Sequence, residues 1–200
     1  MPKTFTDNER KYIKKRLMEE AQNCLKLYGV RKTTVDELVK RVNIPKGTFY
    51  LFFESKEILF YEVLCSFHDE LQAGLMREIE ALDGHVSADR LTELLLELYK
   101  RIEGSFLYKL ITSGDLELLM RKLPPGIANA HAEKDDFSIE QLISMIPGIA
   151  SNNIKVYSAA IRAIFLSMLH KREVGEEVFE DALKLMIRGV VMQMFEVDLK

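Results

Sequence analysis

Four residues between positions 46 and 50 have chemistry that suits contact with a nucleic acid duplex. Lys46 can donate to guanine O6 and N7 or to a phosphate oxygen. Gly47 lets its backbone come close to another molecule, and the hydroxyls of Thr48 and Tyr50 can donate to phosphate oxygens. One short helix would present all four together. The chemistry that we expect of them is therefore binding, not catalysis.

A helix and a turn come directly before these residues. Thr34 can cap a short helix over residues 35–42, and Glu37 completes a capping box three residues further on. Asn43 then interrupts the helix, since asparagine tolerates the left-handed backbone that such a turn requires. Pro45 suits the first position of a following helix, because the N–H that proline lacks has no partner there.

Residues 33–52 together predict a helix-turn-helix, in which two helices of about eight residues flank a turn of three or four. A helix this short is marginal alone, so a scaffold must hold it and present its outer residues. The outward set is expected to be Lys46, Gly47, Thr48 and Tyr50. The inward anchors are expected to be Leu38, Val42 and Phe49.

Two longer helices complete the expected scaffold. The first runs over about residues 8–28, and Gly29 ends it, as glycine does just past a helix. Its inward stripe consists of Ile13, Leu17, Ala21, Cys24 and Tyr28. Ser55 can cap a helix over about residues 56–82. Lys56 adds positive charge at the start of this helix, where helix N–H groups already favour an anion.

The span from about residue 9 to residue 64 resembles the DNA-binding domain of the TetR family of bacterial regulators. The resemblance lies in Gly29, Thr33-Thr34, Gly47-Thr48-Phe49-Tyr50 and Phe52-Phe53-x-x-Lys56-x-x-Leu59. It implies that Lys46 and Gly47 approach bases. It also implies phosphate contacts from Thr34, Thr48, Tyr50 and Lys56. Asn43 and Val39 replace a commoner glycine and alanine, and Val39 is expected to shift the helix spacing and the operator preference.

The distribution of charge favours the same partner. Residues 1–56 hold 13 Lys and Arg against 7 Asp and Glu, whereas the remainder holds 15 against 24. The net charge is therefore +6 in the first segment and −9 in the second, within a chain of −3. A basic end on an acidic body indicates that this end meets a polyanion.

Composition places the chain among ordinary globular proteins, with 48% hydrophobic and 30% charged residues. No apolar run approaches the roughly 18 residues of a membrane span. Residues 1–16 are polar and basic, unlike a signal peptide. Cys24 and Cys65 lie among apolar residues at helical spacing, which favours core thiols in a reducing compartment. We expect a soluble, cytoplasmic protein with no membrane partner.

The sequence contains no catalytic constellation. Cys65-x-x-His68 has no second pair at zinc spacing, and the other histidines are scattered. No Glu-x-x-His pair of a di-iron bundle, G-x-G-x-x-G motif or P-loop occurs. We therefore expect no enzyme activity, no cofactor and no metal.

The remainder of the chain is also expected to be helical, which predicts an all-α fold. Helices are expected over about residues 87–112, 115–122, 152–171 and 176–196, with a further segment from Ser138-x-x-Gln141 to Pro147-Gly148. Two domains are predicted. Residues 1–54 form a three-helix DNA-binding domain with the helix-turn-helix, and residues 55–200 form a helical domain for ligand binding and dimerisation.

The role of residues 55–200 rests on the resemblance, which implies a small-molecule effector and a homodimer. Wide apolar arcs on residues 152–171 and 176–196 favour a dimer interface there, although a pair buried within a monomer would show the same arcs. The expected effector pocket is lined by Phe67, His68, Tyr99, Glu103, Phe106, Tyr108 and Met120.

The predicted function is that of a repressor that binds double-stranded operator DNA as a homodimer and is released by its effector. The alternative is a helix-turn-helix adaptor or structural protein on DNA that has no small-molecule ligand. The two differ in whether residues 55–200 enclose a ligand pocket, which the sequence leaves open.

Overall fold

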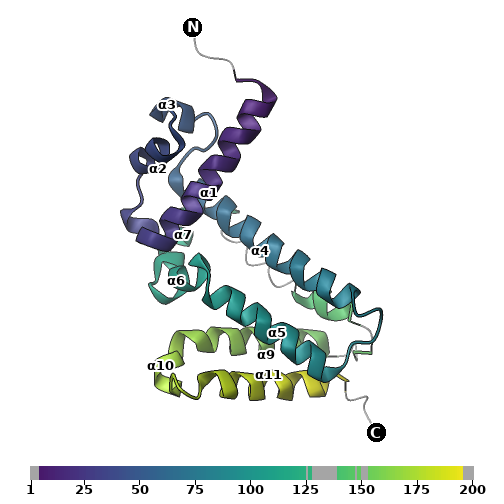
Figure 1. Cartoon of the computed structure of the whole chain (residues 1–200). Coiled ribbons are helices and arrows are strands. Elements are labelled where there is room, and N and C mark those ends of the chain that lie inside the picture. Colours follow the sequence, from purple (N-terminus) through teal and green to yellow (C-terminus); the bar gives the residue numbers. More distant parts are fainter. Residues whose placement is uncertain (1–4, 125, 128–138, 147, 150–152, 196–200) are drawn as a thin grey trace. The chain divides into compact units, whose positions relative to one another are not determined.

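The computed structural model describes residues 5–124, 126–127, 139–146, 148–149 and 153–195, and these residues contain helices and no strand (Figure 1). They fall into two compact units, each with its own packing. The predicted all-α fold is confirmed, with the helix-turn-helix near the N-terminus and further helices after it. Within the described residues, no helix has the length and apolar character needed to cross a membrane.

The first unit, here the recognition unit, contains the helix-turn-helix. It is built from α1 (Asp7–Lys32), α2 (Val35–Val42), α3 (Lys46–Phe49), α4 (Lys56–Glu80) as far as Asp69, α6 (Phe106–Thr112) and α7 (Asp115–Lys122). Helices α6 and α7 pack against α1 although they lie far from it in the sequence. The predicted boundary between a DNA-binding domain, residues 1–54, and a second domain, residues 55–200, stays a prediction.

The second unit, here the body unit, contains the rest of α4 and most of the later helices. They are α5 (Ala88–Glu103), α9 (Ile154–Leu166), the 3-10 turn η2 (Ser167–His170), α10 (Lys171–Val174) and α11 (Phe179–Phe195). Residues 139–144 are also helical, while Ser138 and Pro147 of the predicted segment lie outside the described residues. Helix α11 packs against α5 and α9. The single helix expected over residues 152–171 is not continuous. The α-helical part, α9, ends at Leu166, and η2 and α10 follow it.

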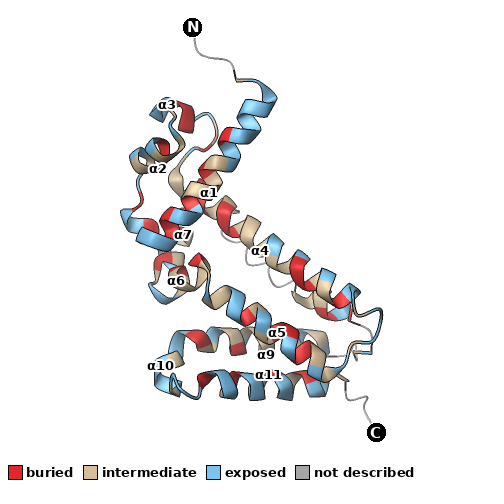
Figure 2. Cartoon of the chain, in the orientation of Figure 1, coloured by how far each residue is buried: buried red, intermediate tan, exposed pale blue. Residues whose placement is uncertain are grey.

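Helix α1 follows the expected stripe over most of its length. Thr6 and Glu9 form a capping box at its start, with Thr6 N–H donating to the Glu9 carboxylate at 2.8 Å. The buried positions are Ile13, Leu17, Ala21, Cys24 and Leu25. Tyr28 is 43% exposed, so its predicted inward position is wrong. The stripe drifts round the helix, and Leu25 takes the core position instead. Figure 2 shows buried, intermediate and exposed stretches following one another along α1.

The expected single helix over residues 87–112 is two helices, α5 and α6. Ser105 leaves the helical conformation and caps α6, its hydroxyl accepting the N–H of Leu107 at 3.1 Å. This break assigns α5 to the body unit and α6 to the recognition unit. The prediction was wrong because the apolar spacing continues through the break.

The core of the body unit lies between α5, α9 and α11. The Tyr99 ring is buried against Phe179 and Phe165, with ring centroids 6.0 and 6.2 Å away. The other large buried residues of α5 and α11 are Leu91, Leu94, Leu95, Leu183, Ile187, Val191 and Met194. At the rim, Arg188 donates to Asp89 at 3.0 Å. Burial of these apolar faces holds the unit together.

Candidate nucleic-acid interface

The first helix of the helix-turn-helix has the predicted bounds, residues 35–42. Thr34 caps it, its hydroxyl accepting the N–H of Glu37 at 3.2 Å. The predicted capping box also requires the Glu37 carboxylate to accept the backbone N–H of Thr34. Instead, this carboxylate accepts the Nε–H of Arg41 at 2.7 Å. Asn43 has φ 57° and ψ 50°, which confirms the left-handed turn.

Helix α3 is a single turn of four residues, half the predicted length. Pro45 lies just before it as the capping residue, one position earlier than expected. Phe49 anchors the turn, with no exposed surface and its ring centroid 5.9 Å from that of Phe53. Leu38 is fully buried beneath it and Val42 is half-buried. The three predicted anchors therefore hold α3 against the recognition unit.

Three of the four residues predicted to face outward do so. Lys46 and Gly47 are exposed, and Tyr50 keeps 52% of its surface exposed. A Cβ atom added to Gly47 would meet no other atom within 4 Å, so the surface of the protein is open there. The glycine is therefore not required by packing within the recognition unit.

Thr48 is buried, with 8% of its surface exposed, so its predicted outward orientation is wrong. Consecutive residues of a helix are about 100° apart around its axis. Because Phe49 points directly into the core, the residue before it lies on the inner half of so short a turn. A phosphate contact from the Thr48 hydroxyl has no support from this orientation.

Lys46 is held by an acidic residue of the preceding helix. Its Nζ lies 2.9 Å from Oδ1 of Asp36 and donates to Oδ2 of the same carboxylate at 3.1 Å. The hydrogen bond to Asp36 and the charge of its carboxylate raise the pKa of Lys46. No pattern in the sequence indicates this role for Asp36, because its partner lies ten residues further along the chain.

Lys56 takes part in packing within the recognition unit. Its Nζ donates to the carbonyl oxygens of Val30 at 2.9 Å and Thr33 at 2.6 Å, which lie at the end of α1. Burial lowers the pKa of Lys56. The ammonium thus satisfies helix-end carbonyls that would otherwise lack a partner. The predicted phosphate contact would have to share this group with both carbonyls.

The end of α1 is bent at Gly29, which has φ 75° and ψ −175°. Only glycine adopts such a backbone readily. The Val30 N–H released by the bend donates to Oδ2 of Asp115 at 2.8 Å. On the other side of the bend, Lys109 donates to the carbonyl oxygens of Lys26 and Leu27 at 3.0 and 2.9 Å. Side chains of α6 and α7 therefore fix the segment that leads into α2.

The predicted effector residues divide between the two units. Phe67 and Phe106 pack together in the recognition unit, with ring centroids 5.1 Å apart. Tyr99 lies in the core of the body unit, where Glu103 accepts a hydrogen bond from Lys171 at 2.5 Å. The other three, all half-buried in the recognition unit, are His68, Tyr108 and Met120. Their role as a pocket stays a prediction.

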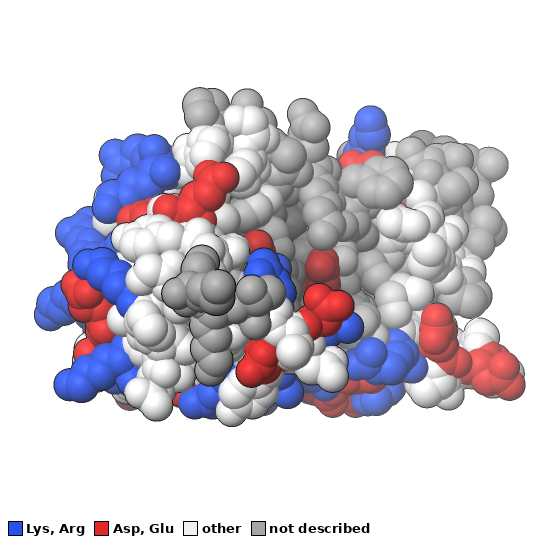
Figure 3. All heavy atoms as spheres, turned by 90° about the horizontal axis from the view of Figure 1, so that it is seen from above, with Lys and Arg blue, Asp and Glu red and all other residues white. Residues whose placement is uncertain are grey.

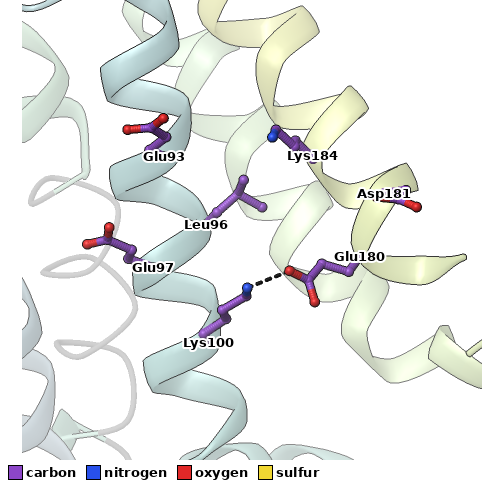
Figure 4. A pocket seen from close by; sticks show the side chains of 7 residues that line it. All are labelled: Glu93, Leu96, Glu97, Lys100, Glu180, Asp181 and Lys184. Atoms are coloured by element: carbon purple, nitrogen blue, oxygen red, sulfur yellow. Dashed lines mark ion pairs between the residues drawn. The ribbon is translucent and has the colours of Figure 1, made fainter. Parts of the chain in front are cut away.

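The body unit has a surface pocket between α5 and α11 (Figure 4). It is lined by Glu93, Leu96, Glu97, Lys100, Glu180, Asp181 and Lys184, and an ion pair between Lys100 and Glu180 crosses it. Such a charged lining differs from the mostly apolar walls of small-molecule sites. None of the predicted effector residues lines it. Over the described ranges, no group of three or more His, Cys, Asp or Glu could hold a metal ion.

Lys and Arg side chains gather on the left of the surface in Figure 3, the side on which Figure 1 places α2 and α3. Acidic side chains lie among them. This agrees with the excess of six positive charges over residues 1–56. Basic side chains near an exposed α3 can contact a phosphate backbone.

The comparisons with known proteins identify the same segment. Residues 17–63 match the model of the family described as "Bacterial regulatory proteins, tetR family". An uncharacterized HTH-type transcriptional regulator of Bacillus subtilis, YhgD, is 33% identical over 88 residues, which are 44% of this chain and 46% of YhgD. The matched stretch therefore spans less than half the length of that relative.

Solved structures extend the likeness to the fold of the whole chain. A TetR-family transcriptional regulator from Streptomyces coelicolor has a TM-score of 0.61 at 14% identity, over 93% of this chain and 97% of that one. The transcriptional regulator FadR from Bacillus subtilis, in complex with stearoyl-CoA, has a TM-score of 0.60 at 13% identity, over 91% and 99%. At such identities the likeness is one of fold.

Proposed function

We propose that this chain, whose residues 17–63 match the TetR-family model, is a TetR-family repressor that binds operator DNA as a homodimer and leaves it on binding a small molecule. The observation that carries the proposal is the exposure of Lys46, Gly47 and Tyr50 on a turn that the buried Phe49 anchors in the core. The protein would act in the cytoplasm, where its operator lies. Two copies of α3 would enter successive major grooves, about 34–36 Å apart.

Tyr50→Phe is expected to weaken binding to every duplex by about fivefold, because it removes one hydrogen bond to phosphate and no base contact. Tyr50 is 52% exposed, so the substitution should leave the folded state unchanged. The measurement is fluorescence anisotropy on a selected duplex and on a scrambled one. Lys46→Ala is the comparison, and it should reduce the preference between the two duplexes. A uniform loss with Lys46→Ala would contradict its base-reading role.

Support for a homodimer comes from exposed apolar residues in the body unit. On α9 they recur at helical spacing, at Val156, Ala159, Ala163 and Leu166. On α11, which packs against α9, Leu185 is 77% exposed, and Met186 and Met192 are 37% exposed. Gly189 lies on the same face with no atom within 4 Å of an added Cβ. Apolar surface of this kind on neighbouring helices is typical of an interface between subunits.

Leu185→Glu is expected to raise the dimer dissociation constant by more than about a hundredfold, because a carboxylate would be buried at the interface without a partner. Sedimentation equilibrium at micromolar concentration measures this constant. The control is Leu27→Glu, since Leu27 is 58% exposed on α1 in the recognition unit. A wild-type monomer, or a Leu185→Glu protein that stays dimeric, would contradict the interface.

Support for an effector comes from the family and from the neighbouring structure of FadR, which holds stearoyl-CoA. The class of effector that we propose is a largely apolar small molecule, since three of the five predicted pocket residues in the recognition unit, Phe67, Phe106 and Tyr108, are aromatic. Acyl thioesters, aromatic compounds and lipophilic cations would be screened by thermal shift. A compound that raises the melting temperature should also release the protein from its duplex. A saturated dimer that keeps its full DNA affinity would contradict release by an effector.

A further inference from the structure

We propose that Asp36 and Lys46 act together as one reader of a G·C base pair in the major groove. In this arrangement Lys46 Nζ donates to guanine O6 or N7, and the Asp36 carboxylate accepts the N4–H of the paired cytosine. The inference rests on the proposed function and extends it to the sequence that is read. It assigns a specificity role to Asp36 of α2.

The two side chains reach each other from separate helices. Asp36 lies in the first turn of α2 and Lys46 is the first residue of α3. Both oxygens of the Asp36 carboxylate lie on the Lys46 ammonium, at 2.9 and 3.1 Å. The side chains are 71% and 52% exposed, so the pair lies on the open surface beside Gly47 and Tyr50.

The pair matches the edge of a G·C pair atom for atom. The major-groove edge presents acceptors on guanine and a donor on cytosine, and the protein pair presents a donor on Lys46 and an acceptor on Asp36. Guanine O6 and cytosine N4 hydrogen-bond to each other at about 2.9 Å. The Lys46 Nζ to Asp36 Oδ1 distance is also 2.9 Å, so both contacts can form at one base pair.

Lys46 and Asp36 can contact the base pair without breaking their ion pair. An ammonium has three N–H donors, and a carboxylate has about four lone-pair directions. The ion pair thus leaves Lys46 at least one donor for guanine and leaves Asp36 an acceptor for cytosine. An A·T pair or a reversed C·G pair would place a donor against the ammonium and an acceptor against the carboxylate. A T·A pair presents thymine O4 and adenine N6–H in the same order as G·C, but it offers Lys46 no N7 acceptor and places the thymine methyl group beside the ammonium.

Packing and helix capping give no other strong reason for a carboxylate at this position. The pair is exposed, and exposed ion pairs contribute little to stability. Thr34 already caps α2, and Glu37 already supplies a negative charge in its first turn. Beside a phosphate backbone, a carboxylate that faced no base would only weaken binding.

The test is selection of bound duplexes from a random pool, followed by affinity measurement on single-base variants of the selected site. The proteins are the wild-type full chain, Asp36→Ala and Lys46→Ala. The wild type should select a G·C pair at one position of each half-site. Both variants should lose about tenfold of the preference at that same position, and the double variant should lose little more.

Glu62→Ala is the matched control, because Glu62 is a half-exposed carboxylate whose partner is Lys14, at 2.6 Å, in the same unit. It should leave the selected sequence unchanged. If Asp36→Ala binds all duplexes more tightly but keeps the wild-type sequence preference, as is expected for Glu62→Ala, the inference is overturned. The proposed function is unaffected by that result. Loss of preference at different positions in the two variants also overturns the inference. If the wild-type protein selects no sequence from the pool, the proposed function itself is contradicted.

Discussion

Gly47→Leu is expected to lower the affinity for a selected duplex by at least about a hundredfold, while the protein unfolds at the same temperature or a higher one. Gly47 lies in α3 with open space where its Cβ would be. Leucine has a higher helix propensity than glycine by about 0.8 kcal/mol, so the substitution should not lower the stability of the free protein. On DNA, however, the new side chain would lie between the backbone and the groove and would hold Lys46 away from the bases.

The measurement for Gly47→Leu pairs anisotropy titration with thermal unfolding of the same sample. Gly126→Leu is the control, since Gly126 also has no atom within 4 Å of an added Cβ and lies outside the helix-turn-helix. The control should bind DNA as the wild type does. Wild-type DNA affinity of Gly47→Leu would show that α3 is not the element that enters the groove.

Gly29→Ala is expected to destabilise the recognition unit by about 3 kcal/mol or more. The backbone at Gly29 has φ 75°, and an added Cβ would clash with Oδ2 of Asp115. The substitution therefore strains the bend and displaces the carboxylate that accepts the N–H of Val30. Chemical denaturation followed by circular dichroism measures the loss as a shift of the midpoint.

Gly114→Ala is the matched comparison for this prediction. Gly114 also has a positive φ of 71°, but an added Cβ meets nothing within 4 Å. Its expected cost is backbone strain alone, about 1 kcal/mol. Equal losses from the two substitutions would show that displacing the Asp115 carboxylate from the Val30 N–H adds nothing to the backbone strain.

The sequence predicted best those elements whose signals are local. Thr34 and Asn43 lie directly at the ends of α2, so its bounds, residues 35–42, were predicted without error. Ser55 caps α4 as expected, its hydroxyl accepting the N–H of Ile58 at 3.2 Å. Exposure of Lys46 and Tyr50 was also predicted, because Phe49 fixes which side of α3 faces the core.

The sequence predicted poorly what depends on distant partners. The sequence predicts Lys56 to be a positive charge at a helix start that is available to a phosphate. Its acceptors in the structure, the carbonyl oxygens of Thr33 and Val30, lie 23 and 26 residues earlier in the chain. Asp115 accepts its hydrogen bond from a residue 85 positions away. The outward orientation predicted for Thr48 was wrong for a different reason: α3 has only four residues, and in so short a turn the residue next to the buried Phe49 is itself buried.

The measurement that tests the account most directly is the affinity of the full-length protein for a selected duplex and for a scrambled duplex at one salt concentration. We expect the selected duplex to bind at least about a thousandfold more tightly, and Lys46→Ala to narrow that ratio. Equal affinity for the two duplexes, or no binding to either, would contradict the claim that α3 reads DNA.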